Sequence, residues 1–171
     1  MQSPESTVRV RPAERGDVPL ILTLIRELAE YERLAEQAVG DEEQLERHLF
    51  GERPAAEAAI AEIGGEPVGF ALYFTTFSTF VARPGIWLED IFVREEHRRA
   101  GAGRALLQHL ARLAVERECG RIEWTALDWN RPALDFYAGL GARPVEGWTI
   151  HRLDGDAIGR LAVRDGGAAP A

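Results

Sequence analysis

The fold is decided by residues 86–107, whose sequence is IWLEDIFVREEHRRAGAGRALL. Residues 86–93 are almost entirely apolar, as expected for a central strand that is covered on both faces. Two glycines follow, and the spacing of Leu106 and Leu110 predicts a helix over about 103–118. A glycine loop between a strand and a helix is typical of phosphate-binding sites. The first amides of a helix have no partner within it, and they lie at the positive end of its dipole.

The elements on both sides of this stretch mix hairpins with strand–helix–strand crossovers, which indicates the α+β class around a mixed sheet. The turn Gly64-Gly65 joins two predicted strands. Asp17 and Asn130 are predicted N-caps, and Gly120 is predicted to follow the end of the helix that begins near Gly103. We expect strands at 7–12, 58–63, 68–77, 121–127 and 148–153, and the other helices at 17–31 (or to 35), 41–49, 130–140 and 156–163.

The length of 171 residues suits one domain, which we place at 7–164 between a flexible start at 1–6 and a disordered tail at 165–171. No apolar run approaches the roughly 20 residues that span a bilayer, and the N-terminus lacks a signal-peptide pattern. These features predict a cytoplasmic protein that does not bind membranes. The net charge of −8 argues against a nucleic-acid partner and suits cationic substrates.

A metal centre is not expected. Cys119 is the only cysteine, so the sequence has no cluster of thiolates for a metal site. The four histidines are scattered along the chain, and no pair of them has ligand spacing.

The glycine loop fits one of three common phosphate-binding patterns better than the other two. A Walker loop needs Gly-Lys-Ser/Thr where residues 103–105 are GRA, and a dinucleotide loop needs a third glycine where Leu106 stands. The pyrophosphate of coenzyme A remains, and Arg98, Arg99 and Arg104 add positive charge around it. The alternative is that two glycines only allow a tight turn between strand and helix.

Two carboxylates, Glu89 and Asp90, interrupt the apolar strand. An alkyl ammonium with a pKa of about 10.4 must lose its proton before it attacks a thioester, which costs roughly 4 to 5 kcal/mol at pH 7. A carboxylate can hold the cation and accept that proton. Neighbours on a strand point to opposite faces, so only one of the pair is expected to face a cleft. The alternative for either carboxylate is a structural role, as the partner of an arginine or of a backbone amide. A β-bulge near Ile91 or Phe92 would free an amide for the oxyanion.

A tyrosine follows Asn130 by about two helical turns, on the same helix face. Tyrosine, with a pKa near 10, can protonate a leaving thiolate, so Tyr137 is a candidate general acid. The alternative is that Tyr137 only packs beside Phe136.

The loop RRAGAG at 98–103 resembles the Arg/Gln-x-x-Gly-x-Gly/Ala loop of the GNAT superfamily of acyl-CoA-dependent N-acetyltransferases. The segments LEDIFV at 88–93 and WNRPALDFY at 129–137 are similar to the diamine acetyltransferases, which act on spermidine, spermine or thialysine. So are RPA at 11–13, IRELAEYE at 25–32 and EGW at 146–148. The resemblance covers residues 8–161.

The resemblance implies a mixed, mostly antiparallel twisted sheet with helices on both faces, in a homodimer. It implies acetyl transfer from acetyl-CoA to a primary amine of a small molecule, a polyamine, diamine or thialysine-like amine, by direct attack in a ternary complex. Glu89 and Tyr137 would be catalytic. The implied cofactor residues are Ile91, Phe92, Val93, Arg98, Arg99, Ala100, Gly101, Ala102, Gly103, Arg104, Asn130, Arg131, Pro132, Ala133 and Tyr137. The implied amine-site residues are Tyr31, Glu32, Glu89, Asp90, Glu123, Trp124, Thr125 and Glu146.

Two other functions stay open. One is a non-catalytic module that binds or senses acyl-CoA. The other is an acetyltransferase that acts on a peptide or an aminoglycoside amine.

Overall fold

The computed structural model describes residues 7–163, so the predictions for 1–6 and 165–171 lie outside the described residues. The described chain forms two compact units, 7–125 and 126–163, and each is described by itself. None of the helices in the described part is long and apolar enough to cross a membrane.

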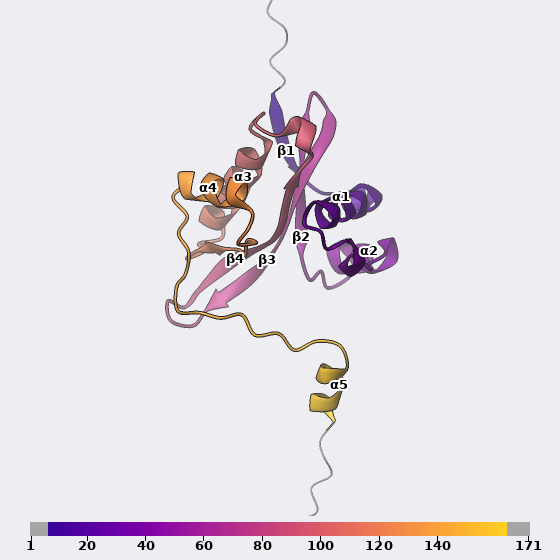
Figure 1. The fold of residues 1–171 in the computed structure, drawn as a ribbon, viewed down its shortest axis with the longest axis vertical. Helices are drawn as coiled ribbons and strands as arrows, with labels where there is room; N and C mark the ends of the chain where they lie inside the picture. Colours follow the sequence, from indigo (N-terminus) through magenta and orange to yellow (C-terminus); the bar gives the residue numbers. More distant parts are fainter. Residues whose placement is uncertain (1–6, 164–171) are drawn as a thin grey trace, which may run out of the picture. The chain divides into compact units, whose positions relative to one another are not determined.

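The first unit is built on a five-stranded sheet with the order β1-β2-β3-β4-β5 (Figure 1). Its strands are β1 (Val8–Pro12), β2 (Glu57–Ile63), β3 (Glu66–Ser78), β4 (Arg83–Val93) and β5 (Ile122–Glu123). The first three pairings are antiparallel and β4 pairs with β5 in parallel, which confirms the predicted mixed, mostly antiparallel sheet.

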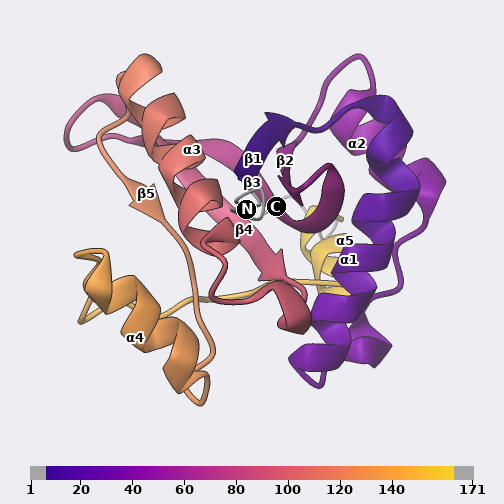
Figure 2. The same ribbon diagram turned by 90° about the horizontal axis from the view of Figure 1, so that it is seen from above.

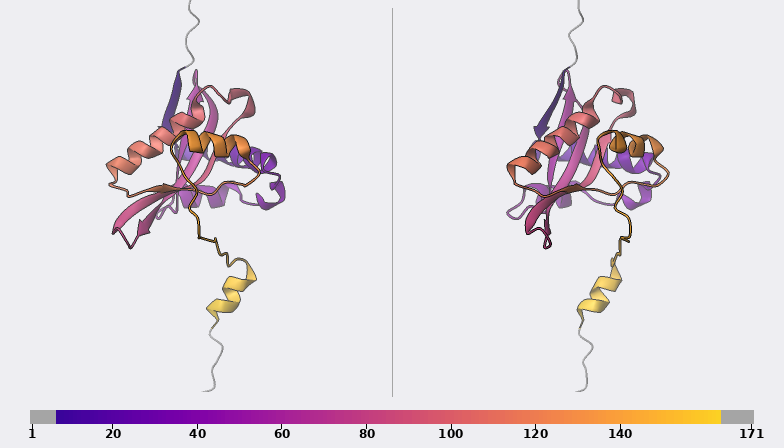
Figure 3. Two further views of the ribbon diagram at one scale, coloured as in Figure 1. Left: turned by 60° about the vertical axis from the view of Figure 1, so that its left-hand side comes forward. Right: turned by 90° about the vertical axis from the view of Figure 1, so that its left-hand side faces the viewer.

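Helices cover both faces of this sheet, as predicted (Figure 2). Helices α1 (Val18–Tyr31) and α2 (Glu42–Phe50) lie on one face, and α3 (Ala102–Glu116) lies on the other. Figure 3 shows α3 lying across the near face of the sheet, with α1 and α2 behind it. The 3-10 turns are Arg15–Asp17, Ala35–Gln37 and Glu95–His97.

Each face of the sheet has its own apolar core. On one face, Ile21 and Leu24 of α1 pack with Phe70 and Phe92 of the sheet. On the other face, α3 packs against the sheet through the stripe of leucines that predicted it, and these leucines are fully buried. The strand and the helix on either side of the glycine loop are therefore fixed by burial.

A β-bulge interrupts the pairing of β3 with β4 at Glu89. Leu72 pairs with Asp90, and the next residue of β3, Tyr73, pairs with Leu88, so Glu89 is the extra residue. Leu88, before the bulge, and Ile91, after it, both pack against the α3 core. Even-numbered residues of β4 therefore face α3 before the bulge, and odd-numbered residues face it afterwards. A bulge near Ile91 or Phe92 was considered from the sequence, and the structure has one at Glu89, two to three residues earlier.

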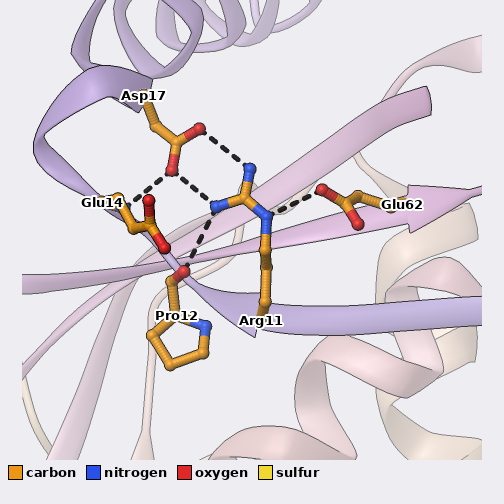
Figure 4. Close-up of polar contacts among 5 residues, drawn as sticks. All are labelled: Arg11, Pro12, Glu14, Asp17 and Glu62. Atoms are coloured by element: carbon orange, nitrogen blue, oxygen red, sulfur yellow. Dashed lines mark hydrogen bonds and ion pairs between the residues drawn. The ribbon is translucent and has the colours of Figure 1, made fainter. Parts of the chain in front are cut away.

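Asp17 precedes α1, but its side chain does not cap that helix. The carboxylate instead accepts hydrogen bonds from Nη1 and Nη2 of Arg11 at 2.6 and 2.9 Å and from the backbone N–H of Glu14 at 2.7 Å (Figure 4). Nε of Arg11 donates to Glu62 on β2 at 2.7 Å. This network joins the end of β1 to the start of α1 and to β2.

Two predicted boundaries in the first unit were wrong. Helix α3 ends before Glu118, which adopts a left-handed φ of 54°, whereas Gly120 is not in that region. The N–H of Gly120 instead donates to Pro84 O at 2.8 Å. Strand β5 covers only Ile122–Glu123 of the predicted 121–127, because its pairing with β4 stops there.

The second unit contains α4 (Arg131–Gly139) and α5 (Asp156–Ala162), close to their predicted bounds. The Asn130 side chain accepts a hydrogen bond from the N–H of Ala133 at 3.4 Å, so its predicted capping role is confirmed. The predicted strand at 148–153 is wrong, since these residues pair with no strand of the described chain and apolar alternation forms a strand only beside a partner.

Candidate active site

Strands β4 and β5 separate midway along β4, six residues before that strand ends at Val93. They pair only through Ile86 with Ile122 and Trp87 with Glu123, so along 88–93 no described strand pairs with this edge of β4. The N–H of Arg94 donates to Val68 O on β3 at 2.9 Å. Because amides alternate along a strand, those of Ile91 and Val93 point away from β3. They are the amides that remain for a ligand, whereas the amide of Phe92 is directed to β3.

The loop at 98–103 has the backbone shape of an anion site. Arg99 and Gly101 both have left-handed φ values, 68° and 92°. Gly101 is the N-cap of α3 and has no side chain to cap it, so the first-turn amides face no side-chain acceptor. Ala102 is 1% exposed and packs into the α3 core, which holds the start of the helix in place. Gly101, Arg99 and Arg104 are exposed, as a phosphate site requires.

Arg98 begins the same loop, but its side chain points elsewhere. Its guanidinium lies 4.3 Å from the ring centroid of Tyr31 and 5.9 Å from that of Phe92. Its Nε donates to Val93 O at 3.1 Å. The structure therefore connects Arg98 with the end of α1 as well as with the loop.

Glu89 and Asp90 lie on the same side of the sheet, so the predicted separation to opposite faces was wrong. Leu72 of β3 packs on the α1 side of the sheet, and Phe74, two residues further along β3, shares that side. Phe74 pairs with Trp87 of β4, and the centroids of their rings are 6.5 Å apart, so Trp87 lies on the α1 side as well. The indole Nε1 of Trp87 donates to Glu89 Oε2 at 2.9 Å, which places Glu89 on this side too. Asp90, opposite Leu72, shares it because the bulge breaks the alternation.

The two carboxylates differ in their surroundings. Glu89 is exposed, whereas burial, together with the charges of Glu89 and Glu32, raises the pKa of Asp90 to about 6. Burial also raises the pKa of Glu32, the residue that follows α1. Glu89 and Glu32 thus both lie within electrostatic reach of Asp90, and such a group of carboxylates favours the binding of a cation.

The other amine-site predictions in this unit divide between the two faces. Glu123 pairs with Trp87 and so lies on the same face of the sheet as Trp87. Its Oε2 forms an ion pair with Arg121 Nε at 2.7 Å. Trp124 packs against the α3 core, on the opposite face from Tyr31. Thr125 is exposed at the end of the unit. The site roles of all three stay predictions.

Three contacts at the site were missed from the sequence: the Trp87 bond to Glu89, the stacking of Arg98 on Tyr31, and the ion pair of Arg94 with Glu27. The first has a local signal, since residues two apart share a strand face. The other two join residues far apart in the sequence, and nothing local predicts them.

The second unit carries the remaining predicted residues. Asn130 caps α4, and Tyr137 lies on that helix with its ring 5.5 Å from the Phe136 ring. Arg131 pairs with Asp135 at 3.4 Å, Pro132 and Ala133 form the first turn, and Glu146 lies in an irregular segment. Their cofactor, catalytic and amine-site roles stay predictions.

Comparison with known proteins gives one consistent result. Residues 23–142 match the model of the Acetyltransferase (GNAT) family. The chain is 42% identical to bovine (Bos taurus) thialysine N-epsilon-acetyltransferase, over 91% of this chain and 97% of the relative. It is 33% identical to the Arabidopsis thaliana L-ornithine N5-acetyltransferase, over 88% and 86%.

Solved structures agree on the fold. An integron cassette protein from the mobile metagenome of V. cholerae superposes with a TM-score of 0.76 at 26% identity, covering 91% of this chain and 97% of that one. The split between β4 and β5, the glycine loop before α3 and these similarities lead to one conclusion: the chain belongs to the GNAT family of acetyltransferases, which transfer the acetyl group of acetyl-CoA to amines.

Proposed function

We propose that this N-acetyltransferase acts on a primary amine of a small molecule that carries a second polar or cationic group, such as a diamine, a polyamine or a thialysine-like amino acid. The observation that carries the proposal is the group of Glu32, Glu89 and Asp90 beside the open edge of β4. A cation bound there lowers the cost of holding these carboxylates ionised near one another.

The names of the relatives support this class of substrate. The bovine relative acts on thialysine and the Arabidopsis relative on L-ornithine, by their names, and both compounds have a side-chain amine at the end of a flexible stem. The net charge of −8 favours the approach of such cations.

The coenzyme fits the residues around the open edge. The first-turn amides of α3 and the exposed Arg99 and Arg104 would hold the pyrophosphate. The amides of Ile91 and Val93 would hold the acyl arm, with one of them donating to the thioester oxygen as it becomes an oxyanion. Asn130 to Ala133 would contact the coenzyme further along.

In the proposed reaction, Glu89 accepts the proton of the ammonium, directly or through one water. The Trp87 indole holds this carboxylate by one oxygen, so the other remains for the amine. The neutral amine attacks the carbonyl carbon, the C–N bond forms and the C–S bond breaks. Tyr137 then donates its phenolic proton to the leaving thiolate, and the second proton that the nitrogen loses on becoming an amide returns through water to the Tyr137 phenolate. Asp90 and Glu32 hold the charge of the substrate and do not enter the bond changes.

The experiment is the release of free thiol from acetyl-CoA over a panel of amines: thialysine, ornithine, lysine, putrescine, spermidine, a peptide amine and an aminoglycoside. Small diamines and thialysine-like amines are expected to give the highest kcat/KM. Glu89→Gln should lower kcat about 100-fold and leave acetyl-CoA affinity nearly unchanged.

Two outcomes would contradict the proposal. Turnover of the peptide or the aminoglycoside alone would assign another substrate class. Binding of acetyl-CoA with no turnover of any amine would favour a sensing module.

The proposal extends to assembly and location. By family resemblance the protein is a homodimer in the cytoplasm, with no nucleic-acid or membrane partner and no metal. Light scattering on the purified chain would test the dimer, and activity that persists in a chelator would test metal independence.

A further inference from the structure

Arg98 belongs to the phosphate loop by sequence, yet its side chain is held by other groups. Its Nε bonds Val93 O at the end of β4, and its guanidinium stacks 4.3 Å from the centroid of the Tyr31 ring. No ion pair joins it to a carboxylate among residues 7–163. A planar guanidinium stacked on a ring is a directional contact, which a lysine does not reproduce.

Tyr31 is the last residue of α1, and Glu32 follows it. Glu32 raises the pKa of Asp90, so the end of α1 lies within electrostatic reach of the acidic group. Moving this helix end therefore changes the surroundings of a bound amine.

The same helix end has a second tie to the segment after β4. Arg94 forms two hydrogen bonds with the Glu27 carboxylate, both 2.9 Å long, and donates to Pro67 O at 3.3 Å. Glu27 and Tyr31 are one turn apart on α1. Arg94 anchors the start of the segment to helix and sheet, whereas Arg98 lies at its other end, where the glycine loop begins.

The loop conformation that the structure shows is one that a bound anion would stabilise. Arg99, adjacent to Arg98, has a φ of 68°, which costs a residue with a side chain about 1 kcal/mol or more. An anion held by the amides that follow stabilises this conformation against the alternatives. Ligand binding thus stabilises further the loop shape in which Arg98 already contacts Tyr31.

We propose that Arg98 is a positioning residue that couples the coenzyme loop to the amine-binding end of α1. When the pyrophosphate fixes the loop, Arg98 holds Tyr31 and Glu32 in place, and the amine binds more tightly. By linkage, the amine tightens the coenzyme by the same factor. The assignment of α1 as a wall of the amine site rests on the function proposed above, whereas the tie between loop and helix does not.

The test compares the wild type with Arg98→Lys, which keeps the charge and loses the planar stack. The matched control is Arg99→Lys, a like substitution at the next, exposed position of the loop. Tyr31→Leu removes the aromatic ring, and Tyr31→Phe keeps the ring but removes the hydroxyl. Desulfo-CoA serves as a coenzyme that cannot react.

The first measurement is hydrogen exchange of the amides at 27–32, with and without saturating desulfo-CoA. In the wild type the coenzyme is expected to slow exchange there about fivefold, the order of a half-buried cation–π contact. Arg98→Lys and Tyr31→Leu should lose this protection, and Arg99→Lys and Tyr31→Phe should retain it. The second measurement is calorimetry of thialysine binding, which should tighten about fivefold with desulfo-CoA in the wild type and not in Arg98→Lys.

Retained protection of residues 27–32 in Arg98→Lys would overturn the proposal. So would an Arg98→Lys variant that only binds the coenzyme as weakly as Arg99→Lys does, while the coenzyme still protects 27–32 and still tightens thialysine binding. If thialysine fails to bind any variant while the coenzyme still protects 27–32 through Arg98, the proposed substrate is wrong and the coupling stands.

Discussion

Replacing Asp90 with asparagine should stabilise the protein. The side chains have nearly the same shape, but only aspartate becomes charged at this half-buried position. Burial, with Glu89 and Glu32 nearby, raises the pKa of Asp90 from 3.8 to about 6. Each unit of pKa corresponds to about 1.4 kcal/mol, so the ionised carboxylate lowers the free energy of unfolding by about 2 to 3 kcal/mol above pH 6.

The pH dependence of this difference follows from the direction of the shift. The folded protein holds the Asp90 proton more tightly than the unfolded chain, so the wild type is most stable relative to the variant below about pH 4. Its stability then falls as the pH rises through about 6 and levels off. Asp90→Asn should match the wild type near pH 4 and exceed it by about 2 to 3 kcal/mol at pH 7.5.

Urea unfolding at pH 4, 5, 6 and 7.5, followed by circular dichroism, would measure the difference. Glu89→Gln is the control: it removes the adjacent, exposed carboxylate and should change stability by no more than about 0.5 kcal/mol. An Asp90→Asn variant that is less stable at pH 7.5, or whose advantage does not vary with pH, would refute the reasoning. Lower activity in a more stable variant would mark Asp90 as functional.

Three further substitutions test the loop, the sheet and the proposed acid. Gly69→Ala would place a Cβ 2.4 Å from Phe92 O, so β4 must shift; urea unfolding should show a loss of about 2 to 3 kcal/mol, and a loss under 0.5 would contradict the packing. The Cβ of Gly101→Ala would meet no atom within 4 Å, but alanine is strained at a φ of 92°. This change should lower the free energy of unfolding by about 1 kcal/mol and weaken acetyl-CoA binding in calorimetry. An unchanged affinity would contradict the role of this loop in binding the coenzyme. Tyr137→Phe should slow thiol release about 100-fold, and full activity would remove its acid role.

Much of the fold could be read from local patterns. The leucine stripe of α3, the Gly64-Gly65 turn and the Asn130 cap each depend on neighbours within a few residues, and each was confirmed. Where the prediction failed, the missing information was a pairing between segments. Residues 148–153 have the alternation of a strand but no described partner, and β5 ends where it separates from β4.

The acidic group shows the same division at the site. The sequence singled out Glu89 and Asp90, since carboxylates are costly in an apolar strand. It could not show that a bulge brings both to one face. A bulge is a mismatch in the register of two strands, and the β3 residues that pair beside it, Leu72 and Tyr73, lie 15 to 18 positions away from their partners in the sequence.

By itself, the sequence determined the order of strand, glycine loop and helix, the chemistry of that loop and the family, because spacing and turn residues act over short distances along the chain. Only the tertiary structure decided the position of the bulge at Glu89, the common face of the two carboxylates and the stacking of Arg98 on Tyr31. The physical reason is that strand register and side-chain stacking depend on which distant segments are packed together, and burial sets that packing for the molecule as a whole.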